Sequence, residues 1–207
     1  TDENRRVDDF AKKHKLSSYS QVILWEFAPQ SGQTNLNFEM VMHAAQLIVQ
    51  LPSTCVILTS PNAFESQEKI IDASSLAIRE NAALTHYCSL LIGCSSGITW
   101  LSTSSAAKFL PMIQLLNPNT AFRNIPSIDF ERYHISTDHL IELTNFSDSQ
   151  LVDCIRSISM SNFNETKKQF NGDMPGSFKT TRKVVYNLMC YLQFGAIYRH
   201  FRIMNNL

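Results

Sequence analysis

Charged residues are scarce in this 207-residue chain, because Asp, Glu, Lys and Arg together make up only 17% of it. Soluble domains usually carry about a quarter. A surface with so little charge must rely on Ser, Thr, Asn and Gln, or part of it is covered by another molecule. The 18 basic and 18 acidic residues balance to a net charge of zero. This balance argues against a protein that binds nucleic acid through bulk electrostatics.

Signatures of several other protein classes are also missing. The sequence has no apolar run of about 18 residues, which a membrane-spanning helix requires, and no secretory signal peptide. Its five cysteines include no C-x-x-C pair, and no two histidines have metal-ligand spacing on one helix face, so we expect no metal site. The motifs of serine hydrolases, P-loop NTPases and classical dehydrogenases are absent. Cys55 and Cys88 stand inside apolar runs and are predicted to be buried thiols, which favours a reducing, cytoplasmic location.

Short apolar runs alternate with helical segments from residue 21 to residue 116. Buried strands are predicted at 21–27, 54–59, 88–92 and 111–116, with a further short strand at 69–73. Helical periodicity covers 38–50, 75–87 and 98–108. This alternation predicts an α/β fold, an open parallel sheet with helices on both faces.

The flanking regions follow other patterns. Residues 2–15 are polar and predicted to be helical, and 117–138, with its prolines and polar residues, is predicted to be a long loop. A helix is expected at 148–159 with Ser147 or Asp148 as its cap, and a long apolar helical tail at 178–203. We therefore divide the chain into an N-terminal helical segment (1–20), an α/β domain (21–146) and a helical C-terminal extension (147–207).

The turn at 93–100, GCSSGITW, is the strongest candidate for a binding site. A predicted strand ends here, and a helix is expected to begin at about Ile98. Free backbone N–H groups and the helix dipole favour an anion at such a position. Gly97 allows close approach to a phosphate, while Ser95, Ser96 and Thr99 offer hydroxyl donors. The alternative is an ordinary strand-to-helix turn, in which Gly and Ser are common.

Two further segments are weaker candidates. The loop Ser31, Gly32, Gln33 and Thr34 follows the first predicted strand, and ligands of open parallel sheets lie beyond the carboxyl ends of strands. The alternative for this loop is a polar linker with a helix cap at Asn37. Arg79 and Glu80 stand out as charges in the helix before the turn. The alternative interpretation is that they form an ordinary pair on the helix surface. Asp72 or Ser74 could cap that helix.

Residues 74–116, SSLAIRENAALTHYCSLLIGCSSGITWLSTSSAAKFLPMIQLL, resemble the carboxy-terminal domain of GT-B glycosyltransferases, most closely the heptosyltransferase-like group. That group combines a SLRE-x-AALL helix and a strand with a G-[ND]-[DS]-SG-x-x-H turn, a helix and a P-x-i-x-L strand. Trp100 stands where the group often has histidine, and Cys94 and Ser95 stand where an acidic residue is frequent.

The resemblance implies a Rossmann-like domain that binds a nucleotide-sugar donor, with the nucleotide-sugar as substrate and neither a cofactor nor a metal. Ser95, Ser96 and Gly97, followed by Ile98 and Thr99, would face the diphosphate. The loop of Ser31, Gly32, Gln33 and Thr34 would close on the other side, with Arg79 and Glu80 as a secondary contact. This domain would be half of a cytoplasmic hexosyl- or heptosyltransferase of cell-surface polysaccharide biosynthesis.

In such enzymes the catalytic base usually comes from an amino-terminal, acceptor-binding domain, on which the apolar tail at 178–203 would pack. Association with a membrane surface would then occur through the full-length protein. Two alternatives stay open. A GT-B-fold nucleotide-sugar epimerase would bind the same donor without an acceptor, and a non-catalytic interaction module would keep the fold and have no nucleotide affinity.

Overall fold

The described part of the chain folds around a six-stranded sheet in which every pair of neighbouring strands is parallel, in the order β3-β2-β1-β4-β5-β6. A computed structural model describes residues 2–27, 34, 36–117, 125–144 and 146–172, which belong to one compact unit, Thr1–Gly172. The strands are β1 Gln21–Glu26, β2 Thr54–Thr59, β3 Ile70–Asp72, β4 Leu90–Gly93, β5 Met112–Leu116 and β6 Leu140–Thr144.

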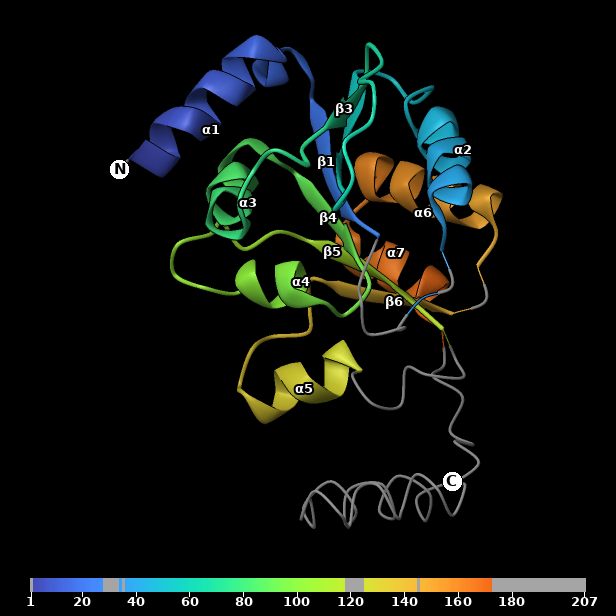
Figure 1. The fold of residues 1–207 in the computed structure, drawn as a ribbon. Coiled ribbons are helices and arrows are strands. Elements are labelled where there is room, and N and C mark those ends of the chain that lie inside the picture. Colours follow the sequence, from blue (N-terminus) through green and yellow to red (C-terminus); the bar gives the residue numbers. More distant parts are fainter. Residues whose placement is uncertain (1, 28–33, 35, 118–124, 145, 173–207) are drawn as a thin grey trace, which may run out of the picture. The chain divides into compact units, whose positions relative to one another are not determined.

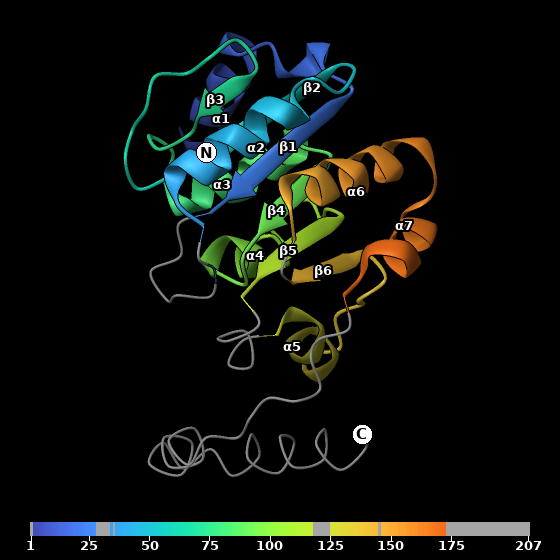
Figure 2. The ribbon, with the colours of Figure 1, turned by 90° about the vertical axis from the view of Figure 1, so that its right-hand side faces the viewer.

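Helices cover both faces of the sheet, with α1, α3 and α4 on one side and α2 and α6 on the other (Figure 1). A quarter turn of the molecule brings α2 and α6 in front of the strands (Figure 2). The α-helices are α1 Asp2–Lys13, α2 Phe38–Ile48, α3 Ile78–Leu84, α4 Gly97–Leu101, α5 Pro126–Arg132, α6 Asp148–Met160 and α7 Phe163–Phe170. Short 3-10 helices follow α1 at Leu16–Ser18 and α3 at Thr85–Tyr87.

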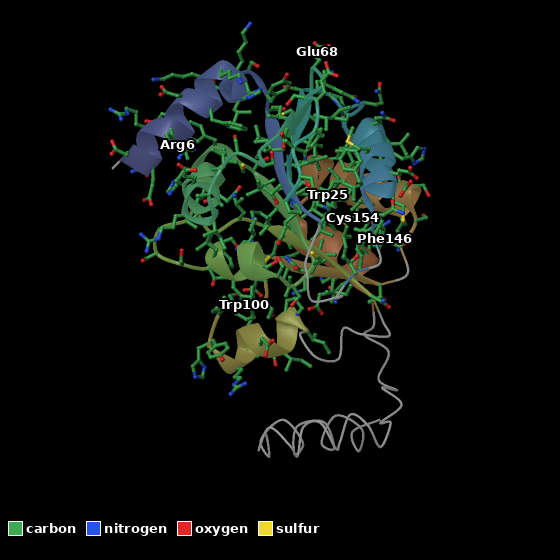
Figure 3. All side chains as sticks on the ribbon, in the orientation of Figure 1. Arg6, Trp25, Glu68, Trp100, Phe146 and Cys154 are labelled. Atoms are coloured by element: carbon green, nitrogen blue, oxygen red, sulfur yellow. The ribbon has the colours of Figure 1, made fainter. Side chains whose placement is uncertain are left out.

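Alternation along each strand divides the core into two apolar clusters, one on each face of the sheet. In β1, Val22 and Leu24 belong to the cluster under α1 and α3, whereas Ile23 and Trp25 belong to the cluster under α2 and α6. Trp25 is only 1% exposed and lies in the same cluster as Cys154 of α6 (Figure 3). Because both faces are covered, the strands are apolar almost throughout, as the sequence shows.

The predicted fold class, an open parallel sheet with helices on both faces, is confirmed, and the architecture is Rossmann-like. The expected caps are confirmed for two helices. Asn37 Oδ1 accepts the N–H of Met40 at 2.9 Å at the start of α2, and Ser147 Oγ accepts the N–H of Gln150 at 3.2 Å at the start of α6. Such caps satisfy N–H groups that a helix cannot bond internally.

The expectation of one long loop over 117–138 is wrong, because α5 occupies Pro126–Arg132. Proline suits the first position of a helix, where the missing N–H costs nothing. Phe130 then anchors the polar helix in the core with no exposed surface. The prediction also missed β6, which pairs along its whole length with β5, and α7, which Asn162 caps through the N–H of Glu165 at 2.9 Å.

Two predicted helices are shorter in the structure. The helix expected over 98–108 ends at Leu101, where the hydroxyls of Ser102 and Thr103 donate to backbone carbonyls one turn back, at 2.6 and 2.7 Å. Such bonds compete with helix continuation. Residues 75–87, expected to form one helix, contain the shorter helix α3 and the 3-10 helix Thr85–Tyr87 that follows it. Neither Asp72 nor Ser74 caps α3, because the Asp72 carboxylate is held by the N–H and hydroxyl of Ser74.

The remaining expectations concern cysteines and the two ends of the chain. Cys55 and Cys88 are buried free thiols as predicted, and Cys94 and Cys154 are buried as well. Within the described residues no helix is both long and apolar enough to cross a membrane. Residues 173–207, which include the predicted apolar tail and Cys190, lie outside the part of the chain that the structure describes.

Candidate nucleotide-binding site at the carboxyl edge of the sheet

The order of the strands reverses its direction between β1 and β4. The chain leaves β1 toward α2 on one face of the sheet and leaves β4 toward α4 on the other face. In open α/β sheets, ligands bind in the crevice outside the carboxyl ends of the strands at such a switch point. The turn predicted as the main site, 93–100, therefore begins where the fold itself favours a ligand.

Gln114 of β5 fixes the conformation of this turn. Its Oε1 atom accepts the backbone N–H of Ser95 at 2.7 Å and the hydroxyl of Thr99 at 3.1 Å. Ser95 adopts a left-handed conformation with φ of 56°, which is uncommon outside glycine. The bond from Gln114 thus holds a bend that the backbone alone would disfavour, and it positions the start of α4.

Gly93 leaves room for the side chain of Gln114 to reach the turn. A Cβ atom on Gly93 would stand 2.6 Å from Thr99 Oγ1 and 2.9 Å from Gln114 Nε2. Real Cβ atoms do not approach other atoms so closely. Glycine at this position therefore leaves the space through which Gln114 and Thr99 meet.

The exposed part of the turn is the start of α4. The first intrahelical bond runs from the Trp100 N–H to the Ser96 carbonyl, so the N–H groups of Gly97, Ile98 and Thr99 have no partner within the helix. The side chain of Ser96, the N-cap residue, makes no capping hydrogen bond. Gly97 is exposed, and a Cβ there would meet only Ile78 Cδ1, at 3.8 Å.

The predicted site residues of the turn thus have different roles. Gly97 and the partly exposed Ile98 present the helix start to solvent. Ser95 and Thr99 are buried, and both bond to Gln114. Ser96 is buried at the N-cap position. A phosphate would therefore meet backbone N–H groups rather than the predicted row of hydroxyl donors.

The second predicted loop lies largely outside the described residues, which exclude Ser31, Gly32 and Gln33. Thr34 is described, and its Oγ1 accepts the N–H of Leu36 at 3.4 Å. The loop joins β1 to α2, so its two ends flank the same switch point.

Glu80 of the predicted secondary site has a structural role. Its side chain is 2% exposed, accepts the N–H of Ala77 at 2.7 Å and forms an ion pair at 3.1 Å with Arg6. Arg6 lies on α1 (Figure 3). These contacts cap α3 and join it to α1. Arg79, in contrast, is exposed in the first turn of α3, next to Ile78, whose Cδ1 atom would lie 3.8 Å from a Cβ atom on Gly97. The structure therefore separates the two charges rather than bringing them to one site.

Trp100 stands where the heptosyltransferase-like motif often has histidine. Its side chain packs into an aromatic cluster between α4 and α5 (Figure 3). Its ring lies edge-on to Phe130 at 5.4 Å and to Tyr133 at 6.0 Å. Arg132 stacks over the Tyr133 ring at 5.4 Å. Trp100 therefore joins α5 to α4.

A row of polar residues at the carboxyl edge was missed by the sequence analysis: Thr59 of β2, Glu26 of β1, Gln114 of β5 and Glu142 of β6. The register pairs Glu26 with Thr59, Gly93 with Gln114, and Gln114 with Glu142. Since Trp25 pairs with Ile92, Glu26 lies level with Gly93. The available signal was a polar residue within each of these four otherwise largely apolar strands.

Most of this row supports the backbone. The Glu142 carboxylate accepts the N–H and the hydroxyl of Ser127 at 2.8 and 2.9 Å, which fixes the start of α5. Burial raises its pKa, and the hydrogen bonds from Ser127 oppose that rise. The Thr59 hydroxyl donates to the Trp25 carbonyl at 3.5 Å. Glu26 differs from Glu142 and Thr59, because within the described part of the chain its Oε2 atom is buried without a hydrogen-bond partner, as is the Nε2 atom of Gln114.

The chain matches no protein-family model, and comparisons with curated proteins and with solved structures likewise give no match. The fold and the local geometry of the turn therefore carry the functional argument.

Proposed function

We propose that the chain binds a nucleotide-sugar at the carboxyl edge of its sheet, with the diphosphate against the start of α4. We further propose that it is the donor-binding domain of a GT-B glycosyltransferase. The observation that carries the proposal is the turn between β4 and α4. Gln114 holds it rigid, and it presents the N–H groups of Gly97 and Ile98 at the switch point of the sheet.

The chemistry of this position suits a diphosphate. Backbone N–H groups at a helix start carry partial positive charge and point toward a bound anion. Gly97 adds no side chain that would keep a phosphate away from them. The resemblance of 74–116 to the donor-binding half of heptosyltransferase-like enzymes supports a sugar donor over other nucleotides.

The proposed mechanism is stabilisation of the leaving group. As the bond between sugar and diphosphate breaks, negative charge grows on the diphosphate. N–H groups that are already oriented stabilise that charge without rearrangement. The acceptor and the catalytic base would come from a second domain of a larger, cytoplasmic enzyme of cell-surface polysaccharide synthesis.

Isothermal titration calorimetry with a panel of nucleoside diphosphates and nucleotide-sugars tests this proposal. We expect saturable binding of at least one nucleotide-sugar at one site per chain, with nucleoside monophosphates binding more weakly because they lack the second phosphate. A circular dichroism spectrum with a cooperative thermal transition serves as the control for folding. A folded sample that binds no member of the panel would contradict the proposal and favour the interaction module.

A further inference from the structure

Glu26 is the one charged residue of β1 and lies at its carboxyl end. It shares a face of the sheet with Val22 and Leu24, on the side that α3 and α4 cover. On the neighbouring strand β4, Gly93 lies level with Glu26, and the turn begins after Gly93. The backbone carbonyl of Glu26 accepts a hydrogen bond from the thiol of Cys94 at 3.6 Å. Glu26 is therefore directly beside the proposed phosphate position.

Among the residues that the structure describes, no hydrogen bond or ion pair of the Glu26 side chain is seen. Glu142, at the other side of the same row, accepts hydrogen bonds through both carboxylate oxygens, whereas Glu26 Oε2 is buried and has no partner among the described residues. Leaving a buried polar atom unpaired is costly. In native proteins such groups are few, and some of them serve catalysis or bind an ion or a water molecule.

The carboxyl group has an unusual ionisation. Burial raises the pKa of Glu26 to about 7. Among the described residues, Cys94 is a titratable neighbour of Glu26: burial raises the pKa of its thiol, and the charge of the Glu26 carboxylate raises that pKa further. Near neutral pH, Glu26 is thus often uncharged, so that it can donate a hydrogen bond and tolerates a nearby diphosphate.

The position of Glu26 differs from that of the acidic residue of dinucleotide-binding folds. Those folds bind a ribose hydroxyl with an acidic residue that lies about 20 residues after the glycine-rich turn. In this chain the second strand, β2, ends at Thr59, which is not acidic. The carboxyl group stands instead on β1, which is adjacent to β4 in the sheet. Neighbouring strands are roughly 4.8 Å apart, so Glu26 can reach a sugar attached to a phosphate at the turn.

We propose that the Glu26 carboxyl group forms a hydrogen bond with a sugar hydroxyl next to the diphosphate of the bound ligand. This inference depends on the proposed nucleotide-sugar site. The hydroxyl belongs either to the transferred sugar or to the ribose, and both share the same hydrogen-bonding chemistry. Glu26 is thereby a ligand-contacting residue that the sequence analysis did not identify.

The test compares wild type, Glu26→Gln and Glu26→Ala by calorimetry from pH 6.0 to pH 8.5, with a nucleotide-sugar and with the matching nucleoside diphosphate. Glu68→Gln is the control, because it removes the same charge from an exposed position before β3 (Figure 3). At pH 6, Glu26→Ala should bind the nucleotide-sugar about 5- to 10-fold more weakly, as expected for one lost hydrogen bond. Wild-type affinity should fall as the pH rises through 7, whereas Glu26→Gln should show no such fall.

The two ligands distinguish the source of the hydroxyl. If Glu26 contacts the transferred sugar, Glu26→Ala weakens only the nucleotide-sugar; if it contacts the ribose, it weakens both ligands equally. Either result supports the inference. Variants that bind both ligands like wild type at every pH would overturn it and leave the proposed function intact. A folded wild type that binds neither ligand would overturn both proposals.

Discussion

Replacing Gly97 with Asp is expected to reduce nucleotide-sugar affinity roughly 100-fold while the protein stays folded. Gly97 is exposed at the first position of α4, where a Cβ would meet only Ile78 Cδ1 at 3.8 Å. A carboxylate there would stand about 5 Å from a bound phosphate charge, and repulsion at that distance amounts to about 3 kcal/mol at an effective dielectric constant of 20.

The same substitution should not weaken the fold. An acidic residue in the first turn of a helix interacts favourably with the dipole, by roughly 0.3–1 kcal/mol. Gly97→Asn is the matched control, because it has nearly the same shape without the charge and should retain most of the affinity. Calorimetric titration together with thermal unfolding of all three proteins checks both expectations. Unchanged affinity in Gly97→Asp would refute the placement of the diphosphate at α4.

Replacing Gly93 with Ala is expected to destabilise the protein by about 1–3 kcal/mol, the usual cost of overpacking a buried position. The new methyl group would stand 2.6 Å from Thr99 Oγ1 and 2.9 Å from Gln114 Nε2. The turn or the Gln114 side chain must therefore shift, and the bond from Ser95 to Gln114 should be lost. Since that bond positions the start of α4, nucleotide-sugar affinity should fall with it.

Gly97→Ala, four residues further on, is the matched control for this experiment. The same methyl group is added there at an exposed position with ordinary contact distances, and alanine is the better helix former. Urea unfolding of both variants should show a lower midpoint for Gly93→Ala and an equal or higher midpoint for Gly97→Ala. If Gly93→Ala unfolds like wild type, then Gln114 does not hold the turn as described.

The fold class could be predicted because a parallel sheet covered on both faces produces continuous apolar strands. The runs at 21–27, 54–59, 88–92 and 111–116 therefore fall on β1, β2, β4 and β5. The strand β6 was missed because Glu142 interrupts its apolar run. That residue becomes acceptable only through hydrogen bonds to Ser127, which the sequence does not reveal. The helix α5 was missed for a similar reason, since a single buried aromatic residue, Phe130, anchors it.

The site could be predicted only in its local part. Small residues after an apolar run indicated the turn at 93–100, and the sheet places the start of this turn at the switch point. The partners of the turn come from elsewhere in the chain. Gln114 follows Ser95 by 19 residues, and Glu26 precedes Cys94 by 68 residues. Glu80 stood out as a rare charge, but its ion pair with Arg6 uses that charge to join two helices.

Backbone amide NMR of the labelled chain during titration with a nucleotide-sugar tests the central claim most directly, because the proposed contacts are made by backbone N–H groups. The account predicts saturable shifts that are largest for Gly97 and Ile98, while the amide of Ser95, already bonded to Gln114, shifts less. Saturable binding that leaves Gly97 and Ile98 unmoved and shifts amides at another edge of the sheet would contradict it.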